Sequence, residues 1–463
     1  MNRRLRPSLP WGMIPVILTL AWPTMLEQLL QTAVQYIDTA MVGSLGTQAT
    51  AAVGATTTVG WLVGSTISAL GIGFLAYISQ ADGAGDREKV SRASAQAVLA
   101  TLICGIFFTA LCLGVSGRIP VWMQVAEDTR DLAAKYFFIL YAPMLFRTAT
   151  IIFGTMLRAA GDTRTPMLIG LGVNVVNVVL NFLLIYPTRQ MVLFGWEFTM
   201  IGAGMGVIGA GIASAVGFTL GGVCIAVAVW RHPRLTFRGR SLKPDWAVLG
   251  PCLKVAVPNA LQRFATSLGY VAFASMINAL GDVATAAHTI ANTVESAFYI
   301  PGYGMQTAAA TLAGNALGAG DRKRIRDLGR MIVIIEVLMM IISGGLLFVF
   351  APRMMGIFSK DLMVITLGAM VLRMVAVSEP FYGVTVILEG MLQGMGKTFI
   401  PLVCNIAGTW GVRIVGTFIC TRYFDMGLVS AWACMIAHNL LLFALFSAYY
   451  GSGKWDRKTA EKP

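Results

Sequence analysis

The sequence has few charged residues, few histidines and no paired cysteines. Only 12% of its 463 residues are charged, which is about half the fraction found in a typical soluble domain. The seven cysteines form no Cys-x-x-Cys pair, so neither a disulfide framework nor a zinc site is expected. His232, His288 and His438 are scattered singly, and no His or Asp pair at useful spacing points to an enzyme. We also expect no cleavable signal, because the first apolar run is long and lacks a small-residue cleavage site.

Long apolar runs take the place of the missing charge. Hydrophobic residues make up 56% of the chain, and its mean hydropathy is +0.72. A helix needs about 20 apolar residues to cross a bilayer. Twelve segments satisfy this: about 13–43, 48–80, 91–115, 131–158, 166–187, 203–230, 250–280, 283–317, 328–351, 363–394, 399–421 and 427–450. The sequence therefore predicts an all-α membrane protein with twelve transmembrane helices.

The net charge is +13, and the Lys and Arg residues that produce it are concentrated in the loops on one side of the membrane. With the N-terminus placed in the cytoplasm, 23 Lys and Arg residues fall in the cytoplasmic loops and tails and 7 in the outer loops. This positive-inside pattern places both termini in the cytoplasm. It also accounts for the basic charge without a nucleic-acid partner. We expect a multi-pass protein of the cytoplasmic membrane, monomeric, with the lipid bilayer as its surroundings.

One fixed offset of 235 residues relates the two halves of the chain. "QADGAGDREK" at 80–89 returns as "NALGAGDRKR" at 315–324, and "GDTRTP" at 161–166 returns as "GKTFIP" at 396–401. Each half holds six predicted spans, so both copies enter the membrane in the same orientation. This is a parallel repeat with a pseudo-two-fold axis along the membrane normal.

The repeat divides the chain into an N-terminal lobe at 13–230, a cytoplasmic linker at 231–249 and a C-terminal lobe at 250–450. Two similar six-helix lobes that face each other across a cleft can open it to either side in turn, which favours a transporter. The first half also carries about 14 extra residues, "TRQMVLFGWEFTMIG", in the outer loop that follows residue 187.

Several stretches resemble the multidrug and toxic compound extrusion (MATE) family: "LAWPTMLEQLLQTAVQYIDTAMVGSLG", "GIGFLAYISQADGAGD", "MLRAAGDTRTP", "NVVLNFLLIYP" and "AAHTIANTVESAFYIPGYGMQTAAATLAGNALGAGD". The likeness runs through both halves. It implies a two-lobed antiporter of twelve helices that exports organic, often cationic, compounds against inward movement of H⁺ or Na⁺. Such a protein is not an enzyme and needs no cofactor beyond its coupling ion.

Other classes remain as alternatives. The main one is a flippase for a lipid-linked glycan or another lipid-like substrate, although such proteins often have extra helices and a strongly cationic cleft. The major facilitator architecture also has six plus six helices, but "GDREKVSR" lacks the glycine that its signature loop places soon after Asp-Arg. A membrane enzyme is disfavoured because it needs a cluster of catalytic residues, and none is evident here. A channel is disfavoured because a pore does not need two similar lobes that can move against each other.

Ionisable residues inside the predicted spans are costly and therefore informative. They comprise six acids, Glu27, Asp38, Glu295, Glu336, Glu379 and Glu389, and four arginines, Arg147, Arg263, Arg373 and Arg413. We expect Glu27 to pair with Arg147, since both fall near mid-membrane. Such a pair leaves Asp38 without a basic partner.

Asp38 is the predicted cation-coupling residue. Its repeat partner is Phe273, so the shared scaffold does not require an acid there. Asp38 lies roughly 8 Å below the outer end of its helix, and Asn181 roughly 9 Å below the end of the fifth span, at 1.5 Å per residue. Asn174, Asn177 and Asn181 share one helix face, and Gln35 and Thr39 are expected to complete the shell. The resemblance also implies a first-helix aspartate facing these amides, which exchanges a proton or coordinates Na⁺; no other metal site is expected.

Two further sets of residues are predicted to take part in transport. Pro15 and Pro23 provide places for the first helix to bend, because proline removes a backbone hydrogen bond. Substrate contacts are expected to be aromatic and methionine-rich with a few acids, since promiscuous pockets repack around varied ligands. The candidates are Tyr36, Met41, Met276, Glu295, Tyr299 and Glu379.

Overall fold

The computed structural model describes residues 11–193 and 196–456. The topology prediction also used basic residues of the two termini that lie outside the described residues. These are Arg3, Arg4, Arg6, Arg457, Lys458 and Lys462. The long helices are α1 (Ile14–Gly43), α2 (Thr47–Gly83), α3 (Arg87–Val115), α5 (Glu127–Tyr141), α6 (Met144–Ala159), α7 (Arg164–Ile185), α8 (Gly206–Arg231), α9 (Trp246–Asn278), α10 (Asp282–Gly318), α11 (Arg322–Phe358), α12 (Leu362–Gly394) and α15 (Leu428–Gly451). The shorter ones are η1 (Trp11–Met13), α4 (Ile119–Trp122), α13 (Phe399–Ile406), η2 (Ala407–Ile414), α14 (Val415–Arg422) and η3 (Lys454–Asp456).

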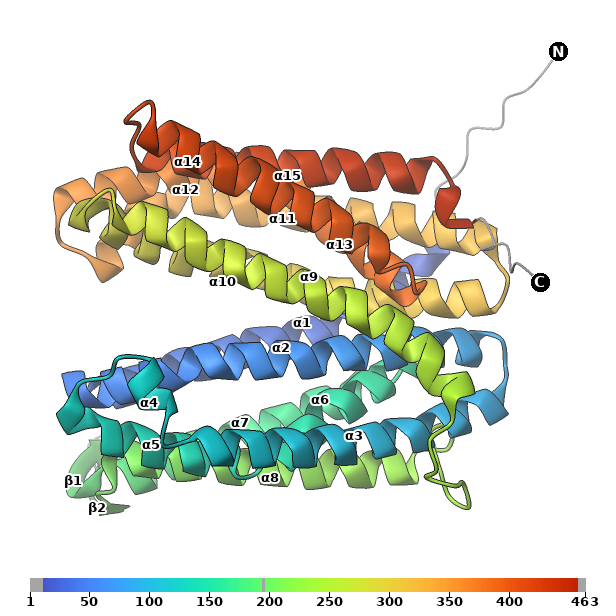
Figure 1. The fold of residues 1–463 in the computed structure, drawn as a ribbon, viewed down its shortest axis with the longest axis horizontal. Coiled ribbons are helices and arrows are strands. Elements are labelled where there is room, and N and C mark those ends of the chain that lie inside the picture. The colour runs from blue at the N-terminus through green and yellow to red at the C-terminus, as the bar shows by residue number, and fades with distance from the viewer. Residues whose placement is uncertain (1–10, 194–195, 457–463) are drawn as a thin grey trace. The chain divides into compact units, whose positions relative to one another are not determined.

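The all-α membrane architecture is confirmed, and each predicted span corresponds to one helix, to the pair α5 and α6, or to the continuous run of α13, η2 and α14. Among the described residues, nine helices are long and apolar enough to cross a membrane, and the pair α5 and α6, bent by 47°, brings the number to ten. The remaining long helices, α9 and α10, have more polar sequences. The π-helix η2 joins α13 to α14, and together they run alongside α15 (Figure 1).

A β-hairpin stands where the sequence predicted an outer loop. Strands β1 (Pro187–Leu193) and β2 (Trp196–Ala203) pair antiparallel, with Arg189 opposite Met200 and an irregularity between Pro187 and Arg189. The tip, residues 194–195, lies outside the described residues. The sequence predicted about 14 extra residues in this loop, and a two-strand ladder satisfies the backbone groups of the paired residues locally.

The chain folds as two compact units, and three helices, α1, α2 and α9, are divided between them. The first unit holds the stretch that ends at Met25, the segment Leu75–Asp86 and the chain from Leu253 onward. The second holds Leu26–Phe74 and Arg87–Cys252. α1 therefore changes unit two residues after Pro23, the proline inside the helix. The predicted lobe boundaries near 230 and 250 remain predictions.

The two predicted bend positions lie in different parts of α1. Pro15 falls in the first turn of the helix, which begins at Ile14, where the backbone N–H has no partner within the helix in any case. Pro23 lies in the interior, so it removes a hydrogen bond to the carbonyl one turn earlier. Pro23 is therefore the position at which the hydrogen bonding inside α1 is interrupted, and a bend at either proline remains a prediction.

The first unit has a core that includes the start of α1. Ile17 and Ala21 are fully buried against Met305, Leu312 and further residues of α10, α11 and α12. The Thr24 hydroxyl donates to the backbone carbonyl of Gly304 at 2.8 Å. This segment of α1 is therefore held by burial and by one hydrogen bond.

The repeated phrases meet each other within the first unit, at the ends of α2 and α10. A Cβ atom on Gly83 would overlap the backbone carbonyl of Asn315, and a Cβ on Gly318 would overlap that of Gln80. Gly83 and Gly318 are 235 residues apart, and so are Gln80 and Asn315, so the contact is reciprocal. Asn315 also donates to Asp82 at 3.4 Å. We call this contact the glycine crossing.

Substituting a glycine of this crossing is expected to destabilise the protein. In Gly83→Ala and in Gly318→Ala, the new methyl group meets a backbone oxygen that no rotamer change can move, so the helices must separate at a cost of about 1–3 kcal/mol. The matched control is Gly345→Ala in α11, where a Cβ meets nothing within 4 Å and where alanine raises helix propensity. Thermal unfolding in detergent measures the difference. Equal melting temperatures for the three variants would contradict the close approach.

The linker after α8 is packed onto the second unit. Leu235 is fully buried, and the Ser91 hydroxyl donates to the carbonyl of Thr236 at 2.9 Å. Arg92 Nη2 donates to Asp245 Oδ2 at 2.6 Å. This hydrogen bond lowers the pKa of Asp245 below its ordinary value. The ion pair therefore persists at neutral pH and is lost only as the pH falls through this lowered pKa.

Candidate functional site

The predicted pairing of Asp38 with an asparagine of α7 is present in the structure. Asp38 lies five residues before the end of α1, and Asn181 lies four residues before the end of α7. Asn181 Nδ2 donates to Asp38 Oδ1 at 2.6 Å. Both residues belong to the second unit. The counting of residues from the helix ends thus placed the two side chains at the correct depth.

The amides continue from Asp38 into the interior of the unit. Asn181 Nδ2 also donates to Asn177 Oδ1 at 3.1 Å, and Asn177 Nδ2 donates to Ser214 Oγ of α8 at 3.3 Å. Asn181 is 1% exposed and Asn177 is 7% exposed, whereas Asp38 is half-buried. The carboxylate therefore stands at the accessible end of a buried polar chain. Ser214 was not predicted, because no pattern in the sequence distinguishes it.

Three other residues of the predicted shell do not bond to Asp38 in the part of the chain that the structure describes. The Thr39 hydroxyl donates to the backbone carbonyl of Gln35 at 2.8 Å, and both residues are exposed. Asn174 shares the asparagine face of α7 but lies half-buried one turn before Asn177. The Thr39 hydroxyl uses its proton on a carbonyl of its own helix, as threonine often does in helices. A coupling role for these residues remains a prediction.

Tyr136 of α5 is a neighbour of Asp38 that the sequence did not suggest. It is 7% exposed and close enough to Asp38 for an electrostatic interaction. Tyr136 packs with Met41 and Ile185 in a core cluster of this unit. Met41, a predicted substrate contact, is 6% exposed, so it is a core residue here. Tyr36 is 45% exposed.

Glu27 pairs with Arg158, so the expected pairing with Arg147 is wrong. Arg158 Nη2 and Glu27 Oε1 are 2.6 Å apart, and the two side chains are only 18% and 8% exposed. Arg158 lies in the last turn of α6, and its long side chain carries the charge back into the unit. The Arg147 guanidinium instead lies over the ring of Phe218 at 4.9 Å. Among the described residues, the structure shows no ion pair for Asp38.

The predicted acids of the first unit are deeply buried. Glu295 of α10 is 7% exposed and Glu379 of α12 is 1% exposed. Met276 is half-buried on α9. Glu389, which we expected to be structural, accepts hydrogen bonds from Gln262 at 2.7 Å and from Gln393 at 3.1 Å. Tyr299 is half-buried on α10 and belongs to a cluster of aromatic rings.

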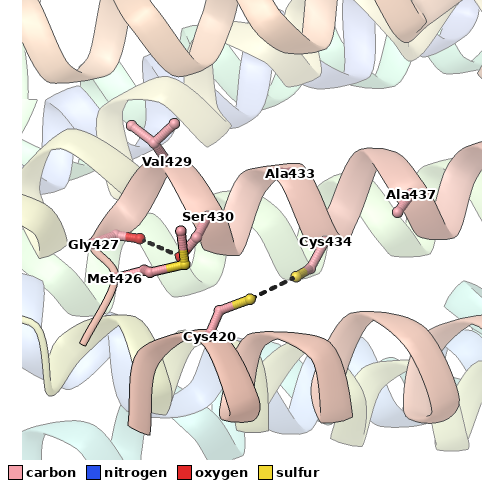
Figure 2. A pocket seen from close by; sticks show the side chains of 8 residues that line it. All are labelled: Cys420, Met426, Gly427, Val429, Ser430, Ala433, Cys434 and Ala437. Carbon is pink, nitrogen blue, oxygen red and sulfur yellow. Dashed lines mark hydrogen bonds between the residues drawn. The ribbon is translucent and has the colours of Figure 1, made fainter. Parts of the chain in front are cut away.

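A surface pocket elsewhere in the first unit contains none of the predicted site residues. It lies between α14 and α15 and is lined by Cys420, Met426, Gly427, Val429, Ser430, Ala433, Cys434 and Ala437 (Figure 2). The Cys420 and Cys434 sulfurs are 4.0 Å apart. The lining has no ionised group that would bind a cation. Within residues 11–193 and 196–456, no cluster of three His, Cys, Asp or Glu side chains is arranged to hold a metal ion.

Comparisons with known proteins cover nearly the whole chain. The sequence model of the MatE family matches residues 23–183 and 258–419, two blocks that begin 235 residues apart. The Probable multidrug resistance protein NorM of Thermotoga maritima is 27% identical over 442 residues, which cover 96% of this chain and 93% of the relative. The Probable multidrug resistance protein YoeA of Bacillus subtilis is 26% identical over 473 residues, covering 99% of this chain and 96% of the relative.

Solved structures share the fold at low sequence identity. A crystal structure of MATE in complex with MaD3S aligns with a TM-score of 0.87 at 22% identity, covering 95% of this chain and 96% of the other. A MOP superfamily transporter from Pyrococcus furiosus, described as having a binding pocket of reverse polarity, aligns with a TM-score of 0.86 at 22% identity, covering 96% of both chains.

Proposed function

This chain belongs to the MatE family, and on that premise we propose that it exports drug-like organic compounds in exchange for protons. Relatives named as probable multidrug resistance proteins match over more than 90% of both chains. We place the protein in the cytoplasmic membrane as a monomer with both termini inside. Its work is transport without a chemical reaction, and it needs no cofactor other than its coupling ion.

The observation that carries the coupling proposal is the Asp38–Asn181 hydrogen bond. A carboxylate inside a membrane is costly unless hydrogen bonds or charges stabilise it, and here an amide N–H supplies that stabilisation at 2.6 Å. Asn181 presents its donor to the carboxylate, while its Oδ1 is buried and has no partner among the described residues. Because a sodium ion needs oxygen ligands, the amide would have to turn round to bind one. The arrangement as it stands favours a proton.

Protonation of Asp38 would then be coupled to transport by alternating access. Neutral Asp38 accepts more weakly from Asn181 than the carboxylate does, so each protonation state favours a different arrangement of α1 and α7. Pro23 gives α1 a place to bend, since a proline inside a helix interrupts its hydrogen bonding. Exchange of a proton for a substrate requires two such conformations, which differ in their affinities for the proton and for the substrate.

The first experiment is uptake of a cationic dye into inside-out proteoliposomes. A proton gradient, acid inside, is expected to drive dye accumulation by the wild-type protein, and a sodium gradient is expected to drive none. Dye uptake that follows sodium alone would replace the proton as coupling ion. An absence of uptake under both gradients would overturn drug export and leave the lipid-linked flippase as the function to test, with a fluorescent lipid as the probe.

A further inference from the structure

The segment that joins α8 to α9 is fastened to α3 and belongs wholly to the second unit. Gln96 Nε2 of α3 donates to the backbone carbonyl of Lys243 at 2.9 Å, and the backbone N–H of Asp245 donates to Gln96 Oε1 at 3.0 Å. These bonds add to those that α3 makes to Thr236 and to the Asp245 carboxylate. The segment therefore has a fixed shape. We call residues 230–246 the linker platform.

The linker platform lies where the surface of the bilayer is expected. α8 has 26 residues, which is a length of about 39 Å at 1.5 Å per residue, whereas the hydrocarbon core of a bilayer is about 30 Å thick. The β-hairpin lies at one end of α8 and the linker platform at the other (Figure 1). Trp230 is one residue from the end of α8, and Trp246 is the first residue of α9. Both tryptophans thus fall at the level of the lipid headgroups.

The linker platform exposes large apolar side chains at that level. Trp230 is 44% exposed, Trp246 is 70% exposed and Leu242 is 41% exposed. The ring of Phe237 packs edge-to-face on Trp230, with the ring centroids 5.0 Å apart. Tryptophan is enriched at membrane–water interfaces, where its ring body meets apolar surroundings and its N–H meets polar ones. This apolar surface is therefore suited to lipid.

The linker platform is also strongly basic. Residues 231–245 contain five Lys and Arg side chains and a single acid, Asp245. That acid is already paired with Arg92 of α3, and Arg240 Nη1 lies 3.6 Å from Glu88 Oε1. Three other cations are exposed and have no carboxylate partner in the part of the chain that the structure describes: Arg231, Arg238 and Lys243. The linker platform thus carries positive charge that the protein does not neutralise.

One cation and one tryptophan are in direct contact. The Arg238 guanidinium lies over the Trp230 ring, 5.2 Å from its centroid. A guanidinium that stacks on a ring keeps its N–H donors at its edge, where they can bind phosphate oxygens. The ring also restricts the side chain before a ligand arrives, which reduces the entropy lost on binding. Charge and apolar surface therefore stand side by side, as phosphate and glycerol ester do in a phospholipid.

We propose that the linker platform binds the headgroup of an anionic phospholipid, with Arg231, Arg238 and Lys243 contacting its charge and the two tryptophans contacting its glycerol and upper acyl chains. A soluble phosphate would engage the cations and leave the exposed rings uncovered, so lipid is the occupant that matches both. The attraction of basic residues to anionic lipid acts only within about 8 Å of the surface, and the platform begins in the last turn of α8. In the predicted orientation, the lipid belongs to the cytoplasmic leaflet.

The test measures lipid binding by native mass spectrometry of the purified full-length protein in detergent. Phosphatidylglycerol and phosphatidylcholine with the same acyl chains are titrated separately. The anionic lipid is expected to bind its first site about tenfold more tightly than the zwitterionic lipid. Glycerol phosphate, which has the charge without the chains, is expected not to displace phosphatidylglycerol at about a hundredfold excess.

Variants separate the charge from the rings. The triple variant Arg231→Gln, Arg238→Gln, Lys243→Gln is expected to weaken phosphatidylglycerol binding by about tenfold, to the level of phosphatidylcholine, and to leave phosphatidylcholine binding unchanged. Trp246→Ala is expected to weaken the binding of both lipids by the same factor, about threefold. The ring contacts the part that the two lipids share, so its loss should not alter the preference for the anion.

Each variant has a matched control. Arg353→Gln, Lys360→Gln, Arg422→Gln removes the same charge from three exposed positions of the first unit, and Arg353 also lies over a ring, that of Phe350 at 5.7 Å. Trp122→Ala removes a tryptophan of α4 that is 61% exposed. Neither control should change the binding of either lipid. Melting temperatures verify folding, and Arg238→Gln alone, with an expected loss of about threefold, decides the question if the triple variant is unfolded.

Four results would overturn this lipid site. They are equal affinity for the two lipids, an unchanged preference in the folded triple variant, an equal loss in its control, and displacement of lipid by glycerol phosphate. The last result would identify a site for soluble phosphates instead. None of these measurements depends on transport, so the export function and the lipid site stand or fall separately.

Discussion

Asp38→Asn is expected to abolish proton-driven accumulation of dye above its external concentration while leaving the fold intact. Asparagine keeps an oxygen at the position that accepts from Asn181 Nδ2 at 2.6 Å, and it has nearly the same volume. What it loses is the ability to bind and release a proton. Because coupling requires that exchange, downhill movement of dye should survive while accumulation against a gradient disappears.

The matched control for this substitution is Asp128→Asn. Asp128 is an exposed acid of the same unit that accepts from Gln48 at 2.8 Å, so the chemical change is identical but is made at an exposed position outside the amide chain of Asp38. Normal accumulation by the control and none by the Asp38 variant, at equal melting temperature, would assign coupling to Asp38. Normal accumulation by Asp38→Asn would move the search to Glu295 and Glu379.

The Glu27–Arg158 pair is expected to have the largest effect on stability. Removing one partner of a buried ion pair leaves an uncompensated charge, at a cost of about 3–5 kcal/mol. Glu27→Gln and Arg158→Gln should therefore each lower the free energy of unfolding by that order, measured by detergent titration. The charge swap, Glu27→Arg with Arg158→Glu, should recover a large part of the loss.

Two controls separate this pair from other charges. Asp131 and Lys135 form an i,i+4 pair whose side chains are 78% and 64% exposed, so Asp131→Asn should cost about 0.5 kcal/mol or less. A swap of Glu27 with Arg147 should restore nothing, because Arg147 lies over Phe218 instead. Rescue by Arg147 rather than by Arg158 would refute the observed pairing.

Helix positions and depths were predictable from the sequence, but side-chain partners were predictable only in part. The depth of Asp38 and Asn181 follows from counting residues along regular helices, and the structure brings those two side chains together. The same counting failed for Glu27. It treated 131–158 as one straight span and matched Glu27 to Arg147 by depth alone, whereas the chain bends by 47° between α5 and α6 and the partner is Arg158, in the last turn of α6.

Contacts between helices of the first unit were the least predictable. Tyr299 was expected to line a substrate site, but nothing in the sequence indicates that its ring packs on those of Tyr303 of α10 and Tyr382 of α12. Their contact depends on how α10 and α12 are rotated against each other, which residue spacing does not specify. Thr39 illustrates a second limit, because its hydroxyl bonds within its own helix although its position suggested a ligand.

The glycine crossing has a consequence for exchanging halves between related proteins. Gly83 and Gly318 each leave room for the backbone of the other copy, so the two phrases are complementary surfaces as well as similar sequences. A chimera that joins the first half of this chain to the second half of a divergent relative would bring together two surfaces that never fitted each other. Such a chimera needs both phrases from one parent.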